Sequence, residues 1–204
     1  MRAIIRAVDP TPASAAVFIT LLGAPSWRSG HHGPSPLSRK DAALLALLHI
    51  DGPQPRDRMA AWLWPEAAQK QANVNLRQRL FRLRQICGHP LVEASALVRL
   101  ADGVRCDWPA EAATHDGELL GGFDYGDHEA LDAWVTAGRE RLRRLRLDHW
   151  AGQAAQLESR GELAAAIGLC QRIVTEAPSL EHGWRRLMRL HFLRGDRAAA
   201  IDAF

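Results

Sequence analysis

The feature of this 204-residue sequence that most restricts its fold is an internal repeat in the region after residue 149. Pairs of identical residues lie 34 positions apart, among them Trp150 and Trp184, Gly161 and Gly195, Ala166 and Ala200, and Ile167 and Ile201. Each unit runs from a tryptophan through a Gly-Glu or Gly-Asp turn to an Ala-Ala-Ala-Ile run. A period of this length is typical of helix pairs that bury their apolar faces by stacking. We therefore expect residues 109–204 to form an all-α domain of helical repeats.

The first half of the chain predicts a strand, three helices and a hairpin. The apolar and β-branched run at 17–22 predicts a strand, which weaker strands can follow before the first helix. Helices are expected at 39–49, 55–64 and 69–87, from their apolar spacing and from the Pro or Gly residues that end them. Residues 96–100 and 104–108 alternate around an Asp-Gly pair, which favours a hairpin turn. The fold class expected for the whole chain is mainly α with small β elements.

The segment 69–87 carries both a buried stripe and a polar face. Apolar residues recur there at three- and four-residue steps, at Ala72, Leu76, Leu80, Leu83 and Cys87. A helix turns by about 100° per residue, which places amide and guanidinium groups on the opposite face. These groups belong to Gln71, Asn75, Gln78, Arg82 and Gln85, flanked by Arg77, Arg79 and Arg84. Residues 67–92 include five cationic side chains and no acidic one, so this face suits an anionic partner.

The charge of the whole chain hides how unevenly it is distributed. Residues 1–108 carry 14 cationic and eight acidic side chains, a net charge of +6, whereas residues 109–204 carry 12 and 15, a net charge of −3. Such asymmetry indicates a basic module joined to a more neutral one. Glutamine and asparagine can pair with adenine and arginine with guanine, while flanking arginines neutralise phosphates. The alternative is that 70–84 is a solvated arginine-rich face.

Several motifs in this order resemble a known class of bacterial regulators. They are Leu21-Leu22-Gly23, Leu63-Trp64-Pro65-Glu66, Asn75-Leu76-Arg77-Gln78 and Arg82-Leu83-Arg84 in the first half, and Gly117-Glu118-Leu119-Leu120, Gly122-Phe123, Trp134 and the Trp150 and Gly161 repeat in the second. The first set resembles the OmpR-type winged helix, and the second resembles the tetratricopeptide-like bacterial transcriptional activator domain. Together they are similar to regulators of the antibiotic regulatory protein (SARP) class over about residues 17–204.

The resemblance implies roles for individual residues. The helix 69–87 would be the recognition helix, in which Arg82 reads a base, Arg84 holds the DNA backbone, and Asn75 and Gln78 face the groove. The helical wheel adds Gln71 as a base reader and Arg77 and Arg79 as backbone contacts. Arg99 and Arg105, beside the expected hairpin turn, would reach the minor groove or phosphates, or would equally be solvated. The loop 64–70 matches a segment that approaches RNA polymerase, with Glu66 and Gln69 as the exposed candidates. Trp64 is expected to be buried, since large aromatic side chains normally are.

No catalytic, cofactor or metal constellation is present in the sequence, so we expect no enzyme and no cofactor. A phosphate-binding Gly-Lys loop, a dinucleotide motif and a His-Glu-x-x-His motif are all missing. The pair His31 and His32 has no nearby Cys, Asp or Glu to complete a metal site. The arginine run at 139–146 reads as a solvated helix face, with a second DNA-facing patch as the alternative, because Glu140 and Asp148 lie at pairing distance.

The leading hypothesis is a DNA-binding transcriptional activator that binds direct repeats in promoters and recruits RNA polymerase. We expect a mobile tail at 1–15, a DNA-binding domain at 16–108 and a helical arm at 109–204, which self-associates on DNA and is truncated because Ile201 and Phe204 would lack a stacking partner. No membrane partner or small-molecule substrate is expected, and the location is cytoplasmic, at the nucleoid when DNA is bound. The rival is a protein-interaction or signal-sensing arm of a larger ATPase or cyclase regulator.

Overall fold

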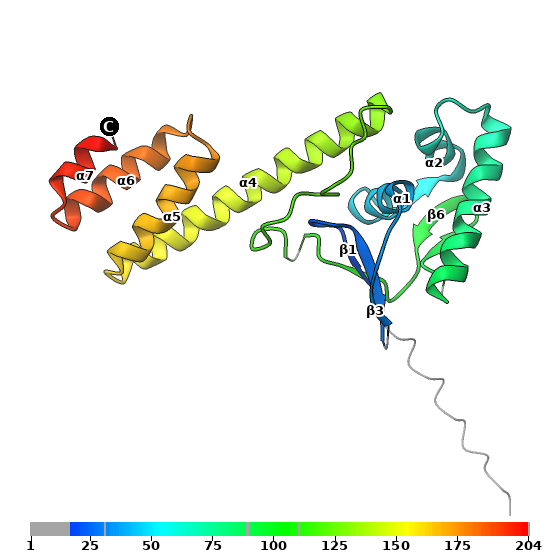
Figure 1. The fold of residues 1–204 in the computed structure, drawn as a ribbon, viewed down its shortest axis with the longest axis horizontal. Helices are drawn as coiled ribbons and strands as arrows, with labels where there is room; N and C mark the ends of the chain where they lie inside the picture. Colours follow the sequence, from blue (N-terminus) through cyan, green and yellow to red (C-terminus); the bar gives the residue numbers. More distant parts are fainter. Residues whose placement is uncertain (1–16, 31, 89, 110, 204) are drawn as a thin grey trace, which may run out of the picture. The chain divides into compact units, whose positions relative to one another are not determined.

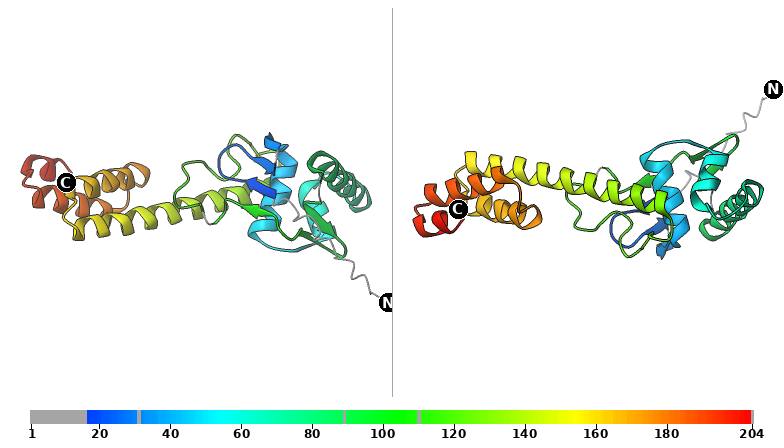
Figure 2. Two further views of the ribbon diagram at one scale, coloured as in Figure 1. Left: turned by 90° about the horizontal axis from the view of Figure 1, so that it is seen from below. Right: turned by 90° about the horizontal axis from the view of Figure 1, so that it is seen from above.

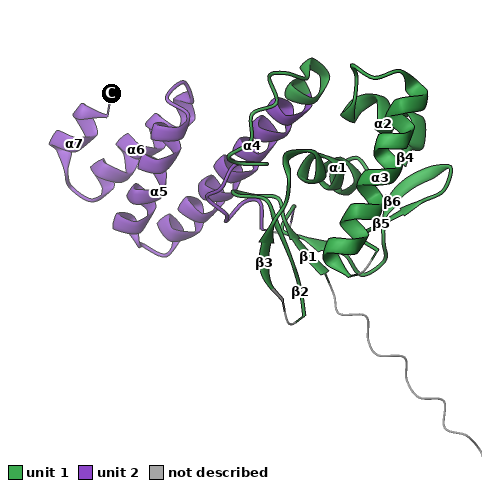
Figure 3. Ribbon diagram, turned by 45° about the vertical axis from the view of Figure 1, so that its right-hand side comes forward, with its two compact units in different colours: residues 1–108, 120–133 green, residues 109–119, 134–204 purple. Residues whose placement is uncertain are grey.

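The computed structural model describes residues 17–30, 32–88, 90–109 and 111–203, which form two compact units (Figures 1 and 3). The first unit comprises the chain up to Trp108 together with Leu120–Ala133, and the second comprises Pro109–Leu119 and the chain from Trp134 onward. The expected mobile tail at 1–15 lies outside the described residues. The chain thus leaves the first unit after Trp108, where the sequence places its domain boundary, and residues 120–133 return to that unit.

The first unit contains two small sheets and three helices. Its elements are β1 (Val17–Thr20), β2 (Ser26–Ser29), β3 (His32–Pro36), α1 (Arg39–Ile50), β4 (Gln54–Pro55), α2 (Arg56–Leu63), α3 (Gln69–Cys87), β5 (Val92–Ala94), β6 (Leu97–Leu100) and β7 (Arg105–Cys106). One sheet has the strand order β3-β2-β1-β7, and the other has the order β4-β6-β5. All pairs are antiparallel except β1 with β7.

Helix α1 is the centre of the first unit, because its residues Asp41–Leu48 are all buried. Ser38 caps it as the sequence predicts, with its Oγ accepting from the Asp41 backbone N–H at 3.4 Å. Helices α2 and α3 pack against each other beside it, as Figure 2 shows from two sides. The bounds of α2 and α3 agree with the predicted helices at 55–64 and 69–87 to within a residue.

The predicted hairpin between 96–100 and 104–108 is wrong, although its turn is present. The N–H of Val104 bonds to the Ala101 carbonyl at 3.3 Å, and Gly103 has a φ of 85°. However, β6 pairs with β4 and β5, whereas β7 pairs with β1 in the other sheet. The physical reason is the buried Asp107 carboxylate, which accepts from the backbone N–H groups of Leu21 and Leu22 at 2.8 and 3.0 Å. These bonds hold the strand beyond the turn against the end of β1.

The second unit confirms the predicted helical repeat. Its helices are α4 (Glu129–Ser159, of which the first five residues belong to the first unit), α5 (Leu163–Glu176), α6 (Glu181–Leu193) and α7 (Arg197–Asp202). The repeat glycines, Gly161 and Gly195, have φ values of 78° and 85° and end the first helix of each pair. Their N–H groups bond at 3.0 and 2.9 Å to the carbonyls three residues earlier. This left-handed helix ending suits glycine because it has no Cβ.

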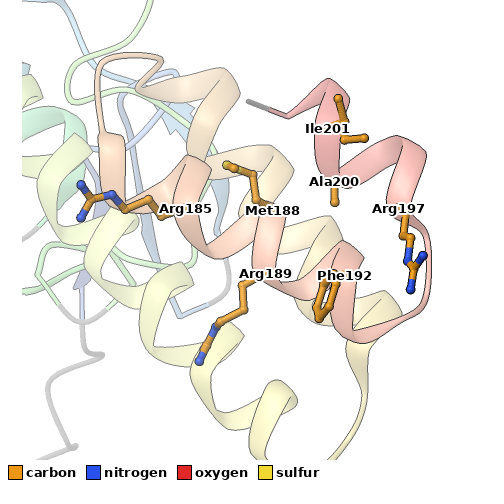
Figure 4. A pocket seen from close by; sticks show the side chains of 7 residues that line it. All are labelled: Arg185, Met188, Arg189, Phe192, Arg197, Ala200 and Ile201. Carbon is orange, nitrogen blue, oxygen red and sulfur yellow. The ribbon is translucent and has the colours of Figure 1, made fainter.

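The two repeats differ in how far their apolar faces are covered. Ile167 is 4% exposed beneath α6, whereas its repeat partner Ile201 is 73% exposed. Ile201 lines an apolar groove of about 680 Å³ along α6 and α7 with Arg185, Met188, Arg189, Phe192, Arg197 and Ala200 (Figure 4). Phe204, which was also expected to lack a partner, lies outside the described residues. Among the helices that the structure describes, none is long and apolar enough to cross a membrane.

Candidate nucleic-acid interface

Helix α3 separates a buried face from a long exposed face, as its periodicity predicts. Ala72, Leu76, Leu83 and Cys87 are buried, and Leu80 is half-buried. The helix ends at Gly88, which has a φ of 68°. No acidic side chain lies anywhere along these 19 residues. The exposed face therefore offers amide groups, guanidinium groups and two apolar side chains to a partner.

The four residues predicted to read bases lie on this exposed side of α3. Gln78 and Arg82 are exposed, and Asn75 is half-buried. Gln71 is exposed, and its Nε2 donates to the Asn75 Oδ1 at 2.9 Å. This bond holds both amide side chains in one orientation while leaving other donors and acceptors free on each. Within the described residues, Arg82 makes no ion pair.

The arginines predicted to hold the DNA backbone fall into two groups on α3. Arg77 and Arg84 are exposed, and neither forms an ion pair in the part of the chain that the structure describes. In contrast, Arg79 is only 25% exposed, and its Nη1 lies 3.4 Å from the Asp41 Oδ2 and 3.2 Å from the Ser38 Oγ. Arg79 thus joins α3 to the first turn of α1.

Asp41, the partner of Arg79, is the buried acid of this region. Burial raises the pKa of the Asp41 carboxyl above its usual range, although the Ser38 hydrogen bond and the Arg79 charge oppose that rise. A carboxylate in such a position depends on its few partners, because desolvation disfavours its charged form. Arg79 therefore has a structural role in the free protein that the sequence does not reveal.

The two arginines beside the 101–104 turn also differ in their surroundings. Arg99 on β6 lies 2.5 Å from the Glu93 carboxylate and 3.3 Å from the Asp102 carboxylate. Arg105 on β7 is exposed, and among the described residues it makes no ion pair. Of these two side chains, Arg105 is the one that can approach a phosphate without giving up an existing partner.

The loop after α2 combines a buried tryptophan with exposed polar groups. Trp64 is 9% exposed, as predicted, and the Lys40 ammonium lies 4.9 Å from its ring centre. Lys40 also donates to the Leu63 carbonyl at 2.8 Å and lies 3.9 Å from the Glu66 carboxylate. Burial lowers the pKa of the Lys40 ammonium, and the Glu66 charge opposes this effect. Gln69 is exposed, and its Nε2 donates to the Asp57 carbonyl at 3.0 Å.

Three of the five arginines in the run at 139–146 are bonded within the second unit, whereas Arg141 and Arg144 are exposed as the sequence predicts. Arg139 donates to the Leu119 carbonyl at 3.0 Å, and Arg146 donates to the Gly117 carbonyl. Arg143 bonds to the Glu176 carbonyl at 2.5 Å and lies 3.7 Å from Glu140, which is the one expected local pair observed there. The correction arises because the acceptors come from loop 117–119 and from α5, which lie far away in the sequence. These three arginines stabilise the second unit.

Two apolar side chains on the exposed side of α3 are absent from the predicted interface. Phe81 is 63% exposed and Ile86 is 64% exposed. A search of the exposed face for amides and guanidiniums passes over them, although their positions on the helical wheel already place them outside the buried stripe. In the described part of the chain, no group of three or more His, Cys, Asp or Glu residues could hold a metal ion. His31 and the side chain of His32 lie outside that part.

Comparison with known proteins finds a family match in the C-terminal half. Residues 108–204 match the family model of the bacterial transcriptional activator domain, which confirms the resemblance found in the sequence. Among solved structures, the chain is similar to Mycobacterium tuberculosis EmbR in complex with a low affinity phosphopeptide, with a TM-score of 0.69 and 21% identity. That match covers 93% of this chain and 58% of the EmbR chain. It supports the predicted mainly α fold with an N-terminal winged helix. A comparison with curated proteins found no match.

Proposed function

Because residues 108–204 match the family model of the bacterial transcriptional activator domain, we propose that the chain is a sequence-specific DNA-binding transcriptional regulator rather than an enzyme. The observation that carries this proposal is the exposed face of α3, where amides and unpaired arginines gather and no acid lies. The major groove admits an α-helix and offers base-edge donors and acceptors to such side chains. In this proposal residues 16–108 are the DNA-binding domain and residues 109–204 are the regulatory arm.

The proposed contacts divide between bases and phosphates. Arg82 pairs with a guanine, while Gln78, Asn75 and Gln71 face adenines or neighbouring base edges. The phosphate contacts come first from the exposed Arg77, Arg84 and Arg105. Arg79 and Arg99 can join them only by giving up partners within the protein, and they therefore contribute less to affinity.

The remaining parts of the proposal concern what the bound protein does. We propose that it acts as an activator, with two or more copies bound at direct repeats through self-association of the helical arm. Glu66 is exposed beside α3 and, together with Gln69, forms the surface offered to RNA polymerase. In this proposal the protein works in the bacterial cytoplasm and lies at the nucleoid when DNA is bound.

Selection of bound duplexes from a random DNA pool by the full chain tests the proposal and reports the spacing of its half-sites. We expect one enriched motif, arranged as a direct repeat. Arg82→Ala should relax the base preference at one position, by about 1–3 kcal/mol of lost discrimination. Arg84→Ala is the matched control, since it should weaken all sequences alike.

One outcome would overturn the proposal, and another would overturn its division of contacts. Failure of the full chain to bind any duplex at low salt would leave the rival, in which the winged helix contacts only protein within a larger ATPase or cyclase regulator. Equal effects of Arg82→Ala and Arg84→Ala on base preference would contradict the division between base and phosphate contacts, while DNA binding itself would stand.

A further inference from the structure

Phe81 is a large apolar side chain that the fold leaves in water. It is the thirteenth residue of α3, and it is 63% exposed. Its neighbours one turn away on the helix are Arg77, Gln78, Arg84 and Gln85, and all four are exposed. Phe81 therefore belongs to no apolar patch on α3, which argues against a conventional protein interface, because such interfaces have an apolar core.

The position of Phe81 around α3 is close to the middle of the exposed face. At about 100° per residue, Phe81 lies about 60° from Gln78 and about 40° from Gln85. Arg77 lies about 40° to one side of it, and Arg82 lies about 100° to the other. When α3 enters a major groove with Gln78 and Arg82 toward the bases, Phe81 lies at the margin of that face, beside Gln78, and its side chain can turn from there toward a base edge.

We propose that Phe81 reads thymine by packing its ring against the C5 methyl group in the major groove. The proposal rests on the proposed DNA-binding function and adds one residue and one base to it. Of the four bases, only thymine presents an apolar group in the major groove, and phenylalanine is among the side chains that contact it. The ring, which is exposed in the free protein, would gain apolar contact only when the groove supplies a methyl group.

The second exposed apolar side chain on α3 provides a matched control. Ile86 is 64% exposed, which is close to the value for Phe81. It lies about 140° from Phe81 around the helix and about 40° from Arg82, and it is the residue before the last of α3. Ile86 is thus the other apolar side chain of α3 that could meet a thymine methyl group. A comparison of the two variants therefore assigns the contact to one of these two positions.

Replacement of thymine by deoxyuridine tests the proposal directly. Deoxyuridine lacks only the C5 methyl group and keeps the hydrogen-bonding edges of thymine. The duplex selected by the full chain is prepared with deoxyuridine at each thymine in turn, and affinity is measured by fluorescence anisotropy. Removal of one buried methyl group is expected to weaken binding about fourfold at one position in each half-site.

The variants assign that loss to a residue. Phe81→Ala should weaken binding to the thymine duplex, and it should bind the thymine and deoxyuridine duplexes equally, because the partner of the methyl group is gone. Ile86→Ala should keep the fourfold preference for thymine. Both side chains are exposed, so neither variant is expected to disturb folding, and circular dichroism checks this.

Each result decides between the proposals. If the full chain binds its selected duplex but deoxyuridine weakens binding at none of the thymine positions, the role of Phe81 is refuted and the DNA-binding function stands. The same conclusion follows if Phe81→Ala retains the thymine preference, or if Ile86→Ala loses it to the same extent. If no duplex is bound at all, the proposed function fails, and the Phe81 contact fails with it.

Discussion

Replacement of Arg79 by alanine should destabilise the first unit while changing DNA affinity little. The Arg79 Nη1 lies 3.4 Å from the Asp41 Oδ2, and the Asp41 side chain is 9% exposed. Loss of one partner of a buried ion pair costs about 3–5 kcal/mol. Arg79 is 25% exposed and Asp41 keeps its 2.5 Å bond from the Ser38 hydroxyl, so we discount the expected loss of unfolding free energy to about 2 kcal/mol.

The cost of Arg79→Ala should depend on pH with a definite sign. Because burial raises the pKa of Asp41, the folded carboxyl binds its proton more tightly than the unfolded one does. The contribution of Asp41 to stability therefore falls as pH rises from its ordinary pKa through its raised pKa. Without the Arg79 charge the pKa of Asp41 rises further, so the pH range over which this contribution falls extends to higher pH. The variant should lose more stability at pH 7 than at pH 3, where Asp41 is protonated in both states.

Hydrogen exchange of the amides in α1 and α3 measures this loss separately from the stability of the helical repeats. The Asp41→Asn background should largely abolish the effect of Arg79→Ala, because no charge is left unpaired. Arg84→Ala, at an exposed site, should cost less than about 0.5 kcal/mol. An Arg79→Ala variant as stable as Arg84→Ala, or equally destabilised at pH 3 and pH 7, would refute the structural role of the Arg79 and Asp41 pair.

Three further changes test other parts of the fold. Asp107→Ala should destabilise the first unit by about 3 kcal/mol in urea unfolding, because it leaves the backbone N–H groups of Leu21 and Leu22 without their acceptor. A variant of wild-type stability would contradict this. Gly161→Ala should cost about 1–2 kcal/mol on thermal unfolding, because its φ of 78° lies in the left-handed region that disfavours a Cβ; a variant of unchanged stability would contradict this. Burial raises the pKa of the Cys106 thiol to about 12, so alkylation in the native protein at pH 8 should be far slower than after unfolding.

The helices of the first unit could be predicted because their signals are local. Ser38 caps α1 at its own first turn, and α3 is fixed by apolar residues three and four positions apart. The partner of a strand is not a local property. Residues 96–100 and 104–108 alternate as a hairpin should, yet the Asp107 carboxylate, whose N–H partners lie 86 and 85 residues away, determines where the second strand lies.

The sequence predicts which face of α3 forms the candidate interface, but it predicts less well which side chains on that face are available for contact. Periodicity alone places Gln78 and Arg82 outward, and both are exposed. It cannot show that Arg79 bonds to a side chain 38 residues away. Phe81 is not among the predicted interface residues for a different reason. The prediction selects side chains that can form hydrogen bonds with bases, whereas a thymine methyl group is contacted by an apolar side chain.

The salt dependence of DNA binding connects these points, because it counts how many cations reach phosphates. Five cationic side chains of the first unit, on α3 and β7, are exposed and make no ion pair within the described residues, namely Lys70, Arg77, Arg82, Arg84 and Arg105. Arg82 is assigned to a base, so neutralisation of four phosphates by the other four predicts a slope of log affinity against log salt of about −3.6. Arg84→Ala should make this slope shallower by about 0.9, whereas Arg79→Ala should leave it unchanged.

A slope of about −5.4 or steeper would mean that Arg79 and Arg99 leave Asp41 and Glu93 for phosphates when DNA binds. In that case Arg79→Ala would make the slope shallower as much as Arg84→Ala does, and the division of the α3 arginines into structural and DNA-contacting groups would be refuted. Affinities measured from about 50 to 300 mM salt, at concentrations evenly spaced on a logarithmic axis, would give this slope. The measurement thus tests whether ion pairs that are present in the free protein persist on DNA.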